Sequence, residues 1–259
     1  MRFVDDVRIC MIFFTRLPVK WQGDLPRERI THAFGAIPVI GLLVGAIGGL
    51  VYFCAGLFGL DPFPSAVLAV GAQIITTGAF HEDGWADVFD GFGGGRSTAE
   101  KIEIMRDSRL GTFGAAALLL ALLLNIHLIA QIGFPLDVAC ALMASGALGR
   151  AALVAVMRFT PAATDDGQSA EAGRPSDPEM ITAIAIAGSA ALILLLVSGG
   201  FSGITAMLIA GAFALAAAFS VGLWAKNQIG GQTGDVLGAS AVAGQLAALA
   251  AIAALVKVG

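Results

Sequence analysis

Residues 81–95, HEDGWADVFDGFGGG, gather four acids and a histidine in a chain that is otherwise strongly apolar. If the stretch is helical, Asp83, Asp87 and Asp90 stand at positions i, i+4 and i+7 and fall within about 60° of one another on one face. Carboxylates held that close repel each other unless a cation lies between them. Mg²⁺ takes oxygen ligands and is commonly shared with phosphates, so the spacing predicts a magnesium site.

The residues beside these three acids are weaker candidates. Glu82 lies about a quarter turn off the shared face and is kept as a fourth candidate ligand, whereas His81 points roughly the opposite way. Either His81 or one of the acids could act as a general base, and the spacing does not choose between them. Gly84 and Gly91 could break the helix and change this geometry. A solvated acidic loop is the alternative interpretation.

Three further polar segments carry groups that suit phosphate, because arginine binds phosphate oxygens through paired hydrogen bonds. MRDSRLGTFG follows the acidic stretch, KNQIGGQTGDVLGA precedes the last apolar stretch, and Arg150 stands eight residues inside an apolar stretch that ends near Arg158. A charge about 12 Å deep usually faces a cavity or a partner. Interfacial anchoring and a plain glycine-rich linker are the alternatives. The candidate substrate-binding residues are Arg106, Asp107, Ser108, Arg109, Arg150, Lys226, Thr233 and Asp235.

The elements that must position these groups are membrane helices. Of the 259 residues, 57% are hydrophobic and 13% charged, against roughly 25% charged in soluble domains. Apolar stretches near 35–58, 65–80, 111–133, 136–157, 180–198, 201–224 and 236–256 are long enough, or nearly so, to cross a bilayer. We therefore predict one all-α, polytopic bundle of about seven spans over residues 1–259, with no nucleic-acid-binding surface. The 34 glycines suit close contacts between its helices.

Lysine and arginine are distributed unequally between the connections. They occur in the segment up to residue 32 and in the stretches 81–110, 158–179 and 225–235, and are missing from 59–64, 134–135 and 199–200. The positive-inside rule then places the N-terminus and every long loop in the cytoplasm of a bacterial inner membrane. The run 9–14 predicts a short helix on the membrane surface, and the polar segment 158–179 predicts a mobile loop or lid. These assignments place the site at the cytoplasmic surface.

The motifs FHEDGWADVFDGFGGG, EIMRDSRLGTFG and GGQTGDVLGA, with FTRLPV and PVIGLLVG before them, resemble the cobalamin synthase family over nearly the whole chain. Members of that family are adenosylcobinamide-GDP ribazoletransferases. The resemblance implies that α-ribazole, or its 5′-phosphate, attacks adenosylcobinamide-GDP and releases GMP. Mg²⁺ held by Asp83, Asp87 and Asp90 would neutralise the diphosphate. Arg106, Arg109 or Arg150 would clamp its remaining oxygens.

To bind the large corrinoid, the protein would need its loops or a partner subunit, for example a second copy in a homo-oligomer.

Two rival functions remain, a phospholipid-making enzyme and a transporter. A CDP-alcohol phosphotransferase uses similar chemistry, but the dipeptide Ala86-Asp87 stands where its signature expects Ala-Arg. A transporter places its ionisable residues near the middle of the spans, whereas here only Arg150 is deep.

Overall fold

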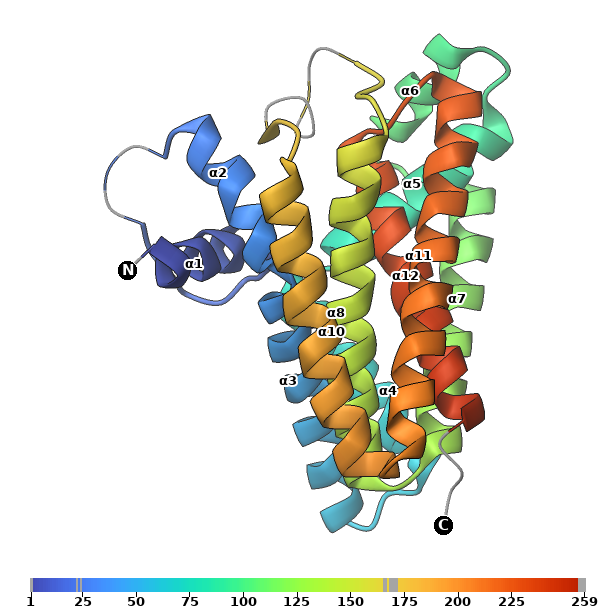
Figure 1. Cartoon of the computed structure of the whole chain (residues 1–259). Helices are drawn as coiled ribbons and strands as arrows, with labels where there is room; N and C mark the ends of the chain where they lie inside the picture. The colour runs from blue at the N-terminus through green and yellow to red at the C-terminus, as the bar shows by residue number, and fades with distance from the viewer. Residues whose placement is uncertain (1, 22, 24, 165–166, 168–171, 256–259) are drawn as a thin grey trace.

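The chain folds into a bundle of helices (Figure 1), seen in a computed structural model that describes residues 2–21, 23, 25–164, 167 and 172–255. Outside the helices, an isolated bridge joins Ala162 to Gln232, and the described residues form no named strand. The all-α prediction is confirmed. The elements are α1 (Arg2–Phe14), α2 (Arg27–Ala33), the 3₁₀ turn η1 (Phe34–Ala36), α3 (Ile37–Leu57), α4 (Pro62–Thr77), α5 (Phe80–Gly94), α6 (Thr98–Met105), α7 (Thr112–Ile132), α8 (Pro135–Phe159), α10 (Asp177–Gly199), α11 (Ser202–Ile229) and α12 (Gly234–Leu255).

Helices occupy all seven predicted apolar stretches, and six spans among the described residues are long and apolar enough to cross a membrane. These six are Glu28–Leu57, which includes α3, and the helices α7, α8, α10, α11 and α12. The remaining stretch is α4, which turns by 91° into α5 and makes a seventh, broken span if the two are counted together. Gly78 and Ala79 take left-handed φ values of 69° and 60° at this turn. The acidic sequence therefore forms a separate helix, α5, which runs nearly perpendicular to α4.

The centre of the bundle is α8, which is buried along most of its length between α3, α10, α11 and α12. Its approach to α3 depends on small residues. A Cβ added at Gly41 would lie 2.2 Å from the carbonyl oxygen of Gly146, and one at Gly45 would lie 2.5 Å from that of Leu142. Because helices in lipid associate through close packing, the glycines explain why this pair can form the core.

The outer helices α10 and α11 turn small residues inward and large ones outward. Ala183, Ala187 and Ala191 repeat every four residues along the buried face of α10, whereas Ile181 and Ile193 are about 60% exposed. In a bilayer the exposed apolar side chains would meet lipid tails, so an inward alanine stripe lets the backbones approach.

The two ends of the bundle differ as the sequence predicts. Figure 1 shows α5, α6 and the α8–α10 and α11–α12 connections at one end, and the short α3–α4, α7–α8 and α10–α11 turns at the other. Helix α1 lies across the direction of the long helices (Figure 1), as expected for a surface helix. Its Asp6 carboxylate accepts from Arg29 on α2 at 2.9 Å and lies 3.2 Å from His32. The long polar connections are therefore at the same end of the bundle as α5 (Figure 1).

Candidate functional site

A polar cavity of about 300 Å³ lies at the elaborated end of the bundle. Four polar segments, far apart in the chain, form its walls: α5, the end of α6, the loop after α8, and the start of α12. Six residues of the predicted lid 158–179, namely 165–166 and 168–171, lie outside the described residues. The cavity is lined by Phe80, Asp83, Ile102, Met105, Arg106, Thr164, Gly167, Thr233, Gly234 and Asp235.

The acids of two helices meet because α5 and α12 pack with little space between them. A Cβ at Gly84 would lie 2.8 Å from the Cα and from the carbonyl oxygen of Asp235. The expectation that Gly84 and Gly91 could break the helix is wrong, because α5 runs continuously from Phe80 to Gly94. Their absent side chains instead admit neighbouring segments, α12 at Gly84 and α6 at Gly91.

Substituting Gly84 by alanine is expected to separate α5 from α12, because the new methyl group meets backbone rather than a flexible side chain. Overpacking of this kind costs about 1–3 kcal/mol and shifts the backbone. We expect a lower midpoint of thermal unfolding in detergent and a loss of turnover. Gly71→Ala is the matched control, since its Cβ would meet nothing within 4 Å. Equal behaviour of the two variants would contradict the close-packing interpretation.

The carboxylates near this contact form a repelling group centred on Asp87. Asp83, Asp235 and Asp90 all act on it electrostatically. Asp83 is exposed and lines the polar cavity, whereas Asp87 is half-buried one turn further along α5 and does not line it. Among the described residues, no three His, Cys, Asp or Glu side chains are placed to hold a metal ion by themselves. Mg²⁺ commonly uses only one or two carboxylates together with substrate phosphates, and the pair Asp83 and Asp87 fits that requirement.

Asp90, the third predicted ligand, is bound to the backbone of α7. Its Oδ2 accepts from the amide of Gly111 at 2.7 Å, and its Oδ1 accepts from that of Gly114 at 2.8 Å. A Cβ on either glycine would clash with this carboxylate. A carboxylate at a helix N-terminus satisfies free amide groups and the helix dipole. Asp90 therefore fastens the MRDSRLGTFG segment to α5, and glycines are needed there to admit it.

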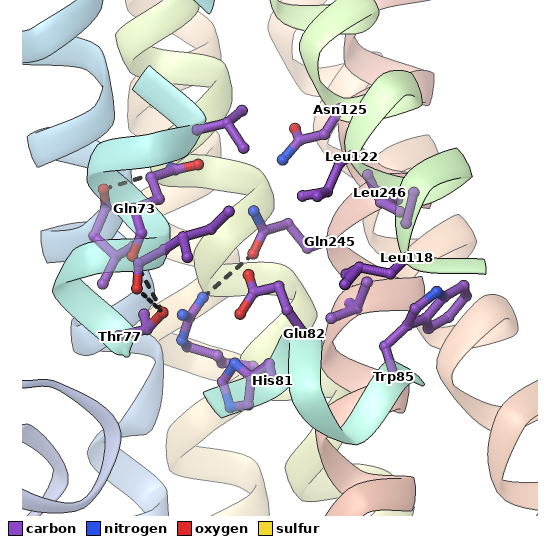
Figure 2. A pocket seen from close by; sticks show the side chains of 16 residues that line it. Gln73, Thr77, His81, Glu82, Trp85, Leu118, Leu122, Asn125, Gln245 and Leu246 are labelled. Atoms are coloured by element: carbon purple, nitrogen blue, oxygen red, sulfur yellow. Dashed lines mark hydrogen bonds between the residues drawn. The ribbon is translucent and has the colours of Figure 1, made fainter. Parts of the chain in front are cut away.

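A second, buried cavity of about 40 Å³ lies inside the bundle on another side of α5. His81 and Glu82 face it together with Gln73, Asn125 and Gln245 (Figure 2). Arg150 also lines this buried cavity and is only 3% exposed. Its Nη1 donates to the carbonyl of Gly146 at 3.1 Å and to Oε1 of Gln245 at 3.4 Å.

The buried cavity corrects two expectations about the site. Arg150 does not line the polar cavity that contains Asp83, and Glu82 leaves the face of the other acids to lie in the electrostatic field of Arg150. Among the described residues, Arg150 Nε, Glu82 Oε2 and His81 Nε2 have no hydrogen-bond partner. A cavity of this size and polarity can hold one or a few waters, which would supply those partners.

The amino-acid sequence was compared with families of known proteins and with individual curated proteins. The family model described as Cobalamin-5-phosphate synthase matches residues 6–253. The chain belongs to this family. Adenosylcobinamide-GDP ribazoletransferase of Mesorhizobium japonicum is 45% identical over 248 residues, which cover 96% of this chain and 92% of that protein. The protein of the same name from Bradyrhizobium diazoefficiens is 41% identical over 251 residues, covering 97% and 94%. The search of solved structures found no match.

Membership of the cobalamin-5-phosphate synthase family makes the chain a transferase of cobalamin biosynthesis embedded in a membrane. It also removes support from the two rival interpretations, a phospholipid-making enzyme and a transporter. The resemblance noted in the acidic and arginine motifs is confirmed over nearly the full length.

In this member of the family, the remaining predicted binding residues divide into two groups. Arg106 lines the polar cavity and attracts the Asp235 carboxylate. The Arg109 side chain is 87% exposed and donates to Asp107 at 3.0 Å, which holds the pKa of Asp107 at about 2. Arg109, Ser108 and Lys226 are exposed and do not line the polar cavity.

The structure also adds residues that the motifs did not single out. Thr164 enters the polar cavity from the loop after α8, which is held to the α11–α12 connection by a hydrogen bond of 2.9 Å from the Ala163 amide to the Gln232 carbonyl. Gln73 and Gln245 face the buried cavity. The sequence could have indicated Gln73 and Gln245, because each is a polar amide inside an apolar stretch. Nothing in the sequence distinguishes Thr164 from the other polar residues around it.

Proposed function

We propose that this protein transfers adenosylcobinamide phosphate from adenosylcobinamide-GDP to a ribose hydroxyl of α-ribazole, or of its 5′-phosphate, and releases GMP. The observation that carries the proposal is the polar cavity, in which Asp83, Asp235 and Arg106 converge from three separate segments. The printed names of the relatives support the donor and the ribazole acceptor. A cavity at one end of the bundle is open to large polar substrates that cannot enter lipid.

The reaction exchanges one phosphorus–oxygen bond for another. The ribose oxygen bonds to the phosphorus that carries the corrinoid, the bond from that phosphorus to the bridging oxygen breaks, and GMP leaves with the bridging oxygen. The hydroxyl proton passes to a base. The acids of the polar cavity are the better candidates for that base, because His81 lines other cavities. Arg106 is placed to hold phosphate oxygens.

We further propose that Asp83 and Asp87 hold Mg²⁺ jointly with the substrate diphosphate. The chemistry of the donors supports this: two accessible carboxylates repel one another beside a cavity that also holds a cationic side chain. When bound, the ion would neutralise charge that develops on the phosphate oxygens. Asp90 and Glu82 are engaged elsewhere, with the α7 amides and in the buried cavity.

The test is turnover by the purified protein in lipid nanodiscs, with adenosylcobinamide-GDP and either α-ribazole or its 5′-phosphate. We expect stoichiometric GMP and a nucleotide-loop corrinoid, abolished by EDTA and restored by Mg²⁺. The ratio of kcat/KM for the two acceptors assigns the preferred one. Absence of GMP with both acceptors would reject the proposal, and full activity in EDTA would reject its metal.

The orientation in the membrane is proposed from the distribution of Lys and Arg, with the α5–α6 end in the cytoplasm. In a cysteine-free background, Arg96→Cys and Asn227→Cys at that end should be labelled only from the cytoplasmic side. Asp61→Cys and Ser202→Cys, in the opposite turns, should be labelled from outside. If Arg96→Cys and Asn227→Cys label from opposite sides, the one-sided site is wrong.

A further inference from the structure

A third cavity, of about 420 Å³, lies between the N-terminal helices and α5. We call it the aromatic cavity, because Phe13, Phe14, Phe34, Phe80 and His81 contribute rings to its lining. None of the described residues that line it is Asp, Glu, Lys or Arg. It is large enough for a small organic molecule, since ligand pockets span about 300–1,000 Å³, and its lining suits an uncharged, flat one.

The rings of the aromatic cavity form one connected cluster. The Phe14 ring lies 6.0 Å from Phe34, 5.6 Å from Phe80 and 5.9 Å from His81, measured between centroids. Aromatic groups prefer such edge and tilted arrangements, and a bound aromatic ring would extend them. The cluster also joins α1 to α5, so the surface helix is part of the wall rather than a separate anchor.

The aromatic cavity adjoins the polar cavity. Phe80 and Gly234 line both of them, and Asp83 lies in the polar cavity one helical turn from Phe80. A molecule with an apolar aromatic part and a polar, hydroxyl-bearing part could therefore occupy both cavities at once. Its hydroxyls would then lie beside the acids and Arg106.

The substrates of the proposed reaction differ in whether they contain a part that fits the aromatic cavity. A diphosphate has no cationic side chain to meet in the aromatic cavity, and burying unpaired charge is costly. The corrin ring with its amide side chains is too large and too polar for such a lining. The ribazole acceptor has a compact benzimidazole base attached to a ribose. The base matches the aromatic cavity, and the ribose matches the adjoining polar cavity.

We propose that the aromatic cavity binds the benzimidazole base of the ribazole acceptor and so presents its ribose to the acids of the polar cavity. This inference rests on the proposed function and adds the location of the acceptor to it. It also assigns α1 and the η1 turn a role in acceptor recognition, through Phe14 and Phe34.

The test uses two variants of the full-length protein in nanodiscs and compares the KM of each substrate. Phe14→Leu removes the ring at the centre of the cluster, and Ile30→Trp places an indole in the cavity from its half-buried rim. We expect the KM for α-ribazole to rise about three- to tenfold in the first, the scale of one lost aromatic contact. A larger rise is expected in the second, with the KM for adenosylcobinamide-GDP unchanged in both.

Matched controls are Phe219→Leu and Ile209→Trp, half-buried residues of α11 that line none of the three cavities. They should leave both KM values near those of the wild type. Unchanged KM for α-ribazole in Phe14→Leu and Ile30→Trp would overturn the inference, and so would an equal rise for both substrates or a fall in kcat alone. A lipid chain filling the cavity would give one of these outcomes. Failure of the proposed function is distinct, because the wild type itself would then release no GMP.

Discussion

The Asp83→Asn variant should lose at least about a hundredfold in turnover, the scale for removing a preorganised electrostatic contact. Asn keeps the size of the side chain and removes the charge that would hold a cation against the diphosphate. Asp83 lines the polar cavity, is exposed, and repels Asp87, so its replacement relieves repulsion and should not destabilise the fold. The measurement is GMP release across a series of Mg²⁺ concentrations, with membrane insertion followed in parallel. Asp87→Asn is expected to behave in the same way.

Asp61→Asn is the matched control for Asp83→Asn, since Asp61 is an exposed acid in the α3–α4 turn at the other end of the bundle. It should retain turnover. Near-normal turnover of Asp83→Asn at every Mg²⁺ concentration would show that Asp83 is not a ligand. A loss shared by Asp61→Asn would instead indicate an effect of net charge.

The Arg150→Met variant should unfold far more readily than the wild type. Arg150 is the attractive charge acting on Glu82, which lies in the same buried cavity. Arg150 and Glu82 attract each other without a direct ion-pair contact, so removing Arg150 leaves the Glu82 carboxylate without a compensating charge in the buried cavity, which is destabilising. We expect a reduced yield of monodisperse protein and a lower midpoint of thermal unfolding in detergent.

The double variant Arg150→Met with Glu82→Gln isolates the electrostatic cause. Removing both charges should recover most of the stability, since the uncompensated carboxylate is gone. A double variant as unstable as Arg150→Met would mean that packing, rather than charge, explains the loss. If the double variant binds adenosylcobinamide-GDP with wild-type affinity, Arg150 stabilises α5 through Glu82 and does not bind the substrate phosphate.

The sequence alone was sufficient for the helices and for the gathering of the polar segments at one end of the bundle. The apolar stretches predicted all seven helical segments, because a chain in hydrocarbon must satisfy its backbone within helices and must be long enough to cross. Their alternation placed the polar segments at one end, and the i, i+4, i+7 spacing put Asp83 and Asp87 in one helix. These are properties of local length, period and order, which neighbouring residues encode.

Tertiary packing alone decided the partners of the charged groups. Asp90 bonds to amides 21 and 24 residues away, and Arg150 bonds to Gln245 across 95 residues. Gly84 brings Asp235 to the acidic helix through a contact between α5 and α12. Helical period gives the direction of a side chain around its own axis, but not which helix lies there or how closely. That depends on which small residues let two helices approach. The sequence suggested one site, but Asp83 lines the polar cavity, Glu82 and Arg150 line the buried cavity, and Asp90 binds the α7 N-terminus.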